Sequence, residues 1–136
     1  GVQVYRKRAK RVISEVSDPL WIRIKKDGKI SYEINQDNRL ITSLSNDLDE
    51  DQFDKFSILI RALESCFPTM PFYNDLANNP NELEQPSISE KELERVFNIF
   101  KSDILNNILD INYLLKIEPF ASNKKQVRLL INNLEL

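Results

Sequence analysis

The sequence of 136 residues contains no histidine. Histidine is the commonest general base near neutral pH, the commonest metal ligand and the usual partner of a serine or cysteine nucleophile. Glycine is also scarce, since Gly1 and Gly28 are the only two. Two isolated glycines cannot build the glycine-rich loops that cradle phosphates in nucleotide-binding proteins. We therefore expect no catalytic, cofactor or metal site within this chain and predict that it is not an enzyme.

Cysteine and long apolar runs are rare as well. A single cysteine, Cys66, excludes an internal disulfide and fits a reducing compartment. Its place on the apolar face of an expected helix predicts a buried, unreactive thiol. No segment approaches the roughly 20 apolar residues of a membrane helix, and no apolar core follows the basic start as it would in a signal peptide. These absences predict a soluble, cytoplasmic protein without a membrane partner.

The first residue, Gly1, stands where a methionine would begin a complete protein. A leading glycine is typical of the sequence that remains after tag removal. We therefore expect this chain to be a fragment of a longer protein.

Acidic residues gather in the segment NDLDEDQFD. A calcium loop that began at Asp47 would need glycine at its sixth position and glutamate at its twelfth. Gln52 and Ile58 occupy these positions, so no calcium site is expected. Acidic side chains at the start of a helix are favoured by the helix dipole, which explains the cluster without a ligand.

A β-hairpin is the clearest short pattern in the sequence. The dipeptide Asp27-Gly28 separates two β-prone runs, which predicts a hairpin near residues 21–34. The apolar residues of the two runs are Trp21, Ile22 and Ile24, then Ile30, Tyr32 and Ile34. A lone hairpin is marginally stable in water, so we expect it to pack on helices.

Helical patterns dominate the rest of the chain. Asp49 with Gln52, and Ser89 with Glu92, match the capping box and predict the starts of two long helices. The first helix is expected to be central to the core, and the second to bury one face. Their apolar stripes are Phe53, Phe56, Ile60, Leu63 and Phe67, then Leu93, Val96, Phe97, Phe100 and Ile104.

Shorter elements complete the expected fold. A short helix with Leu40, Ile41 and Leu44 follows Asn35 as its N-cap, another spans Ile111 to Ile117, and an amphipathic helix around Val127, Leu130, Ile131 and Leu134 closes the chain. Residues 68–88 are expected to be mostly irregular, with one helical turn that has Pro71 as its first residue. The predicted fold class is mainly α: a multi-helix domain over 19–136 with one small β-hairpin.

The N-terminal segment, residues 1–18, is predicted to be a basic amphipathic helix that continues from a missing upstream part. One interpretation of its cations is contact with the phosphates of DNA or RNA. The other is a solvated helix face whose apolar stripe packs against the domain or a second copy. The cations are Arg6, Lys7, Arg8, Lys10 and Arg11, and the stripe is Val2, Tyr5, Ala9, Val12 and Val16.

Several phrases resemble the C-terminal region of bacterial ATP-binding proteins of the GHKL class, the superfamily of gyrase, heat-shock chaperone, histidine kinase and MutL ATPases. They are YRKRAKRVISEVSDPLW, KDGKISYEINQDNRLI, FPTMPFYNDLANNP and LLKIEPF. Within them Glu33-Ile34-Asn35 and Leu40-Ile41 match the family pattern, whereas Asn38 and Arg39 stand where the family has His-Pro. The segments Tyr73-Asn74-Asp75 and Ala77-Asn78-Asn79-Pro80 also match, and the resemblance runs from about Tyr5 to Phe120.

This resemblance implies a parent protein whose nucleotide-binding domain, outside these residues, holds ATP and magnesium. We therefore expect a non-catalytic C-terminal interaction or dimerisation domain of a larger GHKL-type ATPase. Its partner would be a protein, either a second copy or another subunit. The alternative is a nucleic-acid-binding helical module that acts through the basic N-terminal segment.

Overall fold

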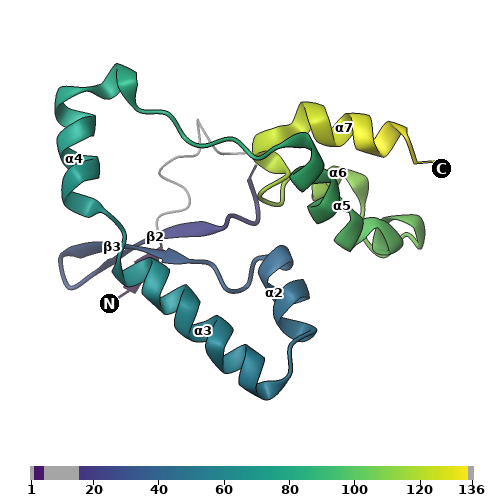
Figure 1. The fold of residues 1–136 in the computed structure, drawn as a ribbon, viewed down its shortest axis with the longest axis horizontal. Helices are drawn as coiled ribbons and strands as arrows, with labels where there is room; N and C mark the ends of the chain where they lie inside the picture. Colours follow the sequence, from purple (N-terminus) through teal and green to yellow (C-terminus); the bar gives the residue numbers. More distant parts are fainter. Residues whose placement is uncertain (1, 5–15, 135–136) are drawn as a thin grey trace.

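The computed structural model describes residues 2–4 and 16–134 (Figure 1). Helices predominate, and a small antiparallel sheet lies along α3, while α5 to α7 are gathered at the end of the molecule opposite the hairpin tip (Figure 1). The predicted class, mainly α with a small hairpin, is confirmed.

The hairpin forms where the sequence predicts it. Strands β2 (Trp21–Lys26) and β3 (Lys29–Ile34) are antiparallel, with Trp21 opposite Ile34 and Lys26 opposite Lys29. Asp27 and Gly28 have φ values of 52° and 77°, as a two-residue type I′ turn requires. A third strand, β1 (Val2–Val4), pairs antiparallel with β2, so the sheet order is β1-β2-β3.

The expected N-terminal helix is wrong at its first turn. Val2 lies in strand β1, where Val4 pairs with Ile24, and Val16 lies outside any helix. The open edge of β2 offers backbone hydrogen-bond partners that residue spacing alone cannot reveal. The rest of that predicted helix, including Tyr5, Ala9 and Val12, lies outside the described residues.

The helix α2 (Arg39–Asn46) is capped by Asn38, so the prediction of Asn35 as its N-cap is wrong. The Asn38 Oδ1 accepts hydrogen bonds from the backbone N–H groups of Leu40 and Ile41, at 2.9 and 3.3 Å. Asn35 instead holds the turn between β3 and α2, since its Oδ1 accepts from the N–H of Asp37 at 3.3 Å. Both asparagines suit a cap chemically, so only the path of the chain separates them.

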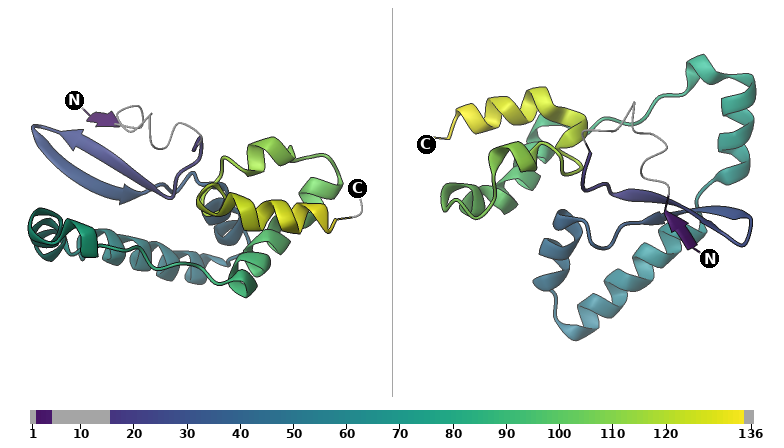
Figure 2. Two further views of the ribbon diagram at one scale, coloured as in Figure 1. Left: turned by 90° about the horizontal axis from the view of Figure 1, so that it is seen from above. Right: turned by 180° about the vertical axis from the view of Figure 1, so that it is seen from behind.

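The helix α3 (Glu50–Ser65) begins with the predicted capping box between Asp49 and Gln52. The expectation that it is the central core helix is wrong, because Ile60 is its only buried residue and Leu63 is 50% exposed. It lies beneath the sheet, as the view from above shows (Figure 2), and contacts β3. A short sheet covers only one stripe of a helix, so the rest of its apolar side faces outward.

Residues 69–78 form a helix, not the irregular stretch with a single turn that the sequence suggested. The helix α4 (Thr69–Asn78) has Pro71 within its first turn, where a proline leaves no helical hydrogen bond unmade. A short 3-10 helix, η1 (Pro80–Glu82), follows, and residues 83–88 have no regular structure. In Figure 1 this segment crosses from α4 to the start of α5.

The core lies in the last third of the chain. The helix α5 (Glu90–Leu105) starts at the predicted Ser89 cap and buries four of its five predicted residues, while Val96 is partly buried against the same core. It packs on α7 (Lys124–Asn132), which follows the 3-10 helix η2 (Ala121–Asn123). Phe120 is fully buried, with its ring 5.5 Å from that of Phe100.

The helix α6 (Ile111–Leu114) is shorter than the expected span from Ile111 to Ile117. The chain leaves the helix because the carbonyl of Lys116 accepts hydrogen bonds from the N–H groups of Ser17 and Asp18, at 3.0 and 3.2 Å. Ile117 then forms an isolated parallel bridge with Asp18.

A buried polar junction joins the sheet to this core. It consists of the side chains of Asp18, Asn35 and Asn38, all of them buried. The Asn38 Nδ2 donates to the carbonyls of Asp18 and Glu118, each at 3.1 Å, and the Asp18 Oδ2 accepts from the N–H of Arg39 at 3.0 Å. Three segments distant in sequence are therefore held together by charge-dipole and amide hydrogen bonds instead of apolar packing.

Candidate interaction surface

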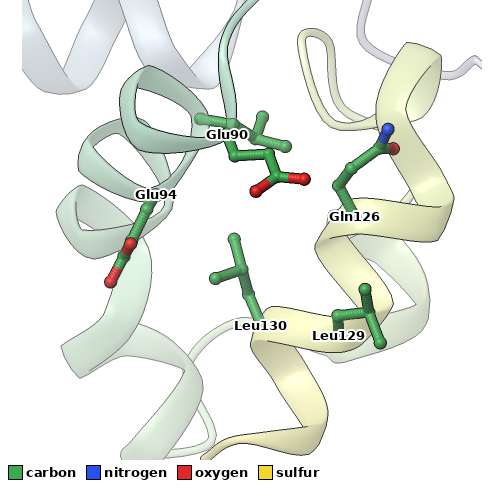
Figure 3. Close-up of a pocket in the computed structure, with 6 residues that line it drawn as sticks. Glu90, Glu94, Gln126, Leu129 and Leu130 are labelled. Atoms are coloured by element: carbon green, nitrogen blue, oxygen red, sulfur yellow. The ribbon is translucent and has the colours of Figure 1, made fainter.

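The described part of the chain contains no cluster of three or more histidine, cysteine, aspartate or glutamate side chains that could hold a metal ion. Its surface hollows differ in size. One lies between α5 and α7 and has a volume of about 140 Å³, below the roughly 300 Å³ at which ligand pockets begin. Glu90 and Leu130 point into this space, whereas Glu94 points away from it (Figure 3).

A larger hollow of about 600 Å³ lies beside the polar junction. Its lining comes from three stretches of chain: Val16 with Pro19 to Trp21, then Gln85, Pro86 and Ile88, and finally Glu118, Pro119, Ser122 and Asn123. Glu118 is the only acid among its lining residues, and its carboxylate accepts hydrogen bonds from the N–H and the hydroxyl of Ser122. A carboxylate that caps the neighbouring turn has no second acid beside it to complete an acid-base pair.

Exposed apolar side chains recur at helical spacing on α3 and α4. Leu59 and Leu63, one turn apart on α3, are 55% and 50% exposed. On α4, Met70, Tyr73 and Leu76 are 75%, 67% and 51% exposed, and α4 buries none of its residues. Single exposed apolar residues are ordinary, but ones that repeat at helical spacing, as on these two consecutive helices, are typical of interaction surfaces. We call these five side chains the α3–α4 apolar residues.

An aromatic cluster attaches α3 and α4 to the sheet. The ring of Phe67, between the two helices, lies 5.9 Å from Trp21, 6.0 Å from Tyr32 and 5.9 Å from Phe72. In addition, the Glu64 carboxylate accepts a hydrogen bond from the N–H of Ile34 at 3.1 Å. The start of α4 is thereby fixed against β2 and β3, while the rest of its apolar side stays uncovered.

The expectation that Cys66 is buried is wrong, because this residue is exposed. It caps the C-terminal end of α3, beyond the stripe that faces β3. Its Sγ lies 3.8 Å from the hydroxyl of Ser65.

The proposed nucleic-acid contacts Arg6, Lys7, Arg8, Lys10 and Arg11 lie outside the described residues. A second basic group, formed by Lys25, Lys26 and Lys29, lies at the end of the hairpin. The motif Lys-Lys-Asp-Gly-Lys shows these cations in the sequence, but only the strand register brings Lys26 and Lys29 opposite each other. The full length of α4 has a sequence signal too, since Met70, Tyr73 and Leu76 repeat at steps of three.

Comparison of this chain with models of known families, with curated proteins and with solved structures finds no match. The resemblance to GHKL proteins therefore stays a prediction. No helix of the described residues has the length and apolar character needed to cross a membrane.

Proposed function

We propose that this chain is a non-catalytic interaction domain that associates with a second copy of itself. The observation that supports this proposal is the outward position of the α3–α4 apolar residues. Burying large apolar side chains contributes roughly 1.5–3 kcal/mol each, so five of them represent a substantial driving force for association.

The distribution of charge along the chain supports a second copy as the partner. Of the 19 basic and 21 acidic residues, residues 1–34 hold nine and four, whereas residues 35–136 hold ten and seventeen. The N-terminal part is therefore positive and the helical part, which includes α3 and α4, is negative. Opposite charges on two parts of one molecule favour contact between copies in which unlike parts meet.

The wider setting that we propose is a GHKL-type ATPase, with this chain as its accessory C-terminal part. ATP and magnesium would then be bound elsewhere in the parent protein. The resemblance of residues such as Glu33-Ile34-Asn35 supports this setting. The chain by itself should accordingly neither bind nor hydrolyse ATP.

Sedimentation velocity across protein concentrations of about 1–200 μM tests the self-association. We expect a reversible shift from monomer to a larger species. The paired substitutions Leu59→Asp with Leu63→Asp, and Met70→Asp with Tyr73→Asp, should each keep the protein monomeric at the top concentration. A charge at the core of an interface strongly disfavours association. The same charge should leave the monomer folded, because all four positions are at least half exposed in the single chain.

The matched control is Ile108→Asp with Leu129→Asp, which changes two equally exposed apolar residues outside α3 and α4. The control should associate as the wild type does. A wild-type protein that remains monomeric over the whole range, or a control that dissociates as readily as the α3 variant, would contradict the proposal.

A further inference from the structure

The tip of the hairpin is a basic surface that is separate from the α3–α4 apolar residues. Lys25, Lys26 and Lys29 are exposed at the tip of β2 and β3, and the tip forms one edge of the molecule (Figure 2). These three lysine side chains form no ion pair with another described residue. Their charge is therefore available to a partner.

The strand register places two of these lysines opposite each other, which destabilises the hairpin when no partner is bound. Lys26 lies directly opposite Lys29, which places two like charges in a cross-strand pair. Such a pair destabilises a hairpin, whereas an opposite charge at either position would stabilise it. An anionic partner between the two ammonium groups would remove the repulsion.

The basic residues 6–11 of the sequence are not part of this site, which consists of the three hairpin lysines. Strand β1 carries the chain away from the tip, because Val2 lies opposite Lys26 and Val4 lies opposite Ile24.

We propose that Lys25, Lys26 and Lys29 bind the phosphate backbone of a nucleic acid. Lysine is a flexible point charge, so it suits phosphates and does not read base edges. The two aromatic residues of the hairpin that could stack on bases, Trp21 and Tyr32, contact Phe67 instead. Binding is therefore independent of base sequence.

The chemistry of the tip distinguishes a nucleic acid from a membrane surface. Proteins that lie on anionic lipid insert apolar or aromatic side chains beside their cations. The turn Lys26-Asp27-Gly28-Lys29 has none, and Trp21 lies at the opposite end of β2. Ile30, half exposed opposite Lys25, is a single apolar side chain and does not form an apolar face.

Fluorescence anisotropy with labelled duplexes of two unrelated sequences tests the proposal, at salt concentrations from 50 to 200 mM. The wild type should bind both duplexes equally, with an affinity that falls steeply with salt. The variant Lys25→Ala/Lys26→Ala/Lys29→Ala should lose up to three phosphate contacts, which lowers the slope of log K against log salt by up to about 2.7. Over this fourfold range in salt, a slope difference of about 2.7 means that the wild type loses about 40-fold more affinity than the variant.

The matched control is Lys91→Ala/Lys101→Ala/Lys125→Ala, which removes three exposed lysines from α5 and α7 and changes the net charge equally. It should leave the salt slope unchanged. Circular dichroism and thermal melting verify that both variants fold. Absence of wild-type binding at 50 mM salt, equal losses in the two variants, or binding to vesicles of anionic lipid but to neither duplex would overturn the proposal.

Discussion

At the scale of single residues, Asn38 uses every hydrogen-bonding group of its side chain. Its Oδ1 accepts two backbone N–H groups of α2, and its Nδ2 donates to the carbonyls of Asp18 and Glu118. The side chain is completely buried, so no water can replace these bonds. One residue thus starts a helix and closes the polar junction at the same time.

Asn38→Ala should lower the free energy of unfolding by about 2–4 kcal/mol, because the variant loses the cap and leaves two carbonyls unsatisfied. Asn38→Asp should cost at least as much, since a carboxylate cannot donate to those carbonyls. Urea denaturation measures both. Asn46→Ala, at the exposed end of the same helix, is the control and should change stability by less than about 0.5 kcal/mol. Equal effects at positions 38 and 46 would contradict this account of the junction.

At the scale of elements, the two capping boxes were predictable because their partners lie three residues apart. Such interactions depend on local chain geometry and hardly on the rest of the fold. The same locality explains why the Asp27-Gly28 turn could be placed, since positive φ values at both positions select those residue types.

The capping box of α5 also makes stability depend on pH. The hydrogen bonds that the Ser89 hydroxyl and then its N–H donate to the carboxylate lower the pKa of Glu92 below its usual value of 4.5. Because the pKa is lower in the folded than in the unfolded chain, ionised Glu92 stabilises the fold above the unfolded value. This contribution disappears as the pH falls through the lowered folded pKa.

The variant Glu92→Gln should therefore lose less stability than the wild type between pH 5 and pH 3, when both are compared by urea denaturation. Glu94→Gln, with an exposed carboxyl group on the same helix, should retain the acid dependence of the wild type. Identical pH profiles for Glu92→Gln and the wild type would show that the capping box does not set this dependence.

At the scale of the whole molecule, apolar packing is uneven. The largest fully buried side chains belong to the last third of the chain, apart from Asn38, whereas α4 buries nothing. Local stability follows buried contacts, so different parts of the chain should open with different free energies.

Hydrogen-deuterium exchange should therefore find the slowest amides in α5 and around Phe120 and Val127. The amides of α4 should exchange orders of magnitude faster at low protein concentration, since few contacts must break to expose them. If self-association covers α4, its protection should rise with protein concentration while that of α5 stays constant. Slow exchange in α4 at concentrations where the protein is monomeric would contradict the described packing.

The sequence by itself determined the features that depend on neighbours in the chain: the hairpin turn, the starts of α3 and α5, the buried stripe of α5 and the absence of histidine and of glycine-rich loops. It could not decide which amphipathic helices become core, because an apolar stripe has the same spacing whether it meets this chain or another. Only the tertiary structure decided that α3 is peripheral, that Cys66 is exposed and that Asn38 joins three segments. These features depend on contacts between residues as far apart as Asn38 and Glu118, and no local pattern encodes such contacts.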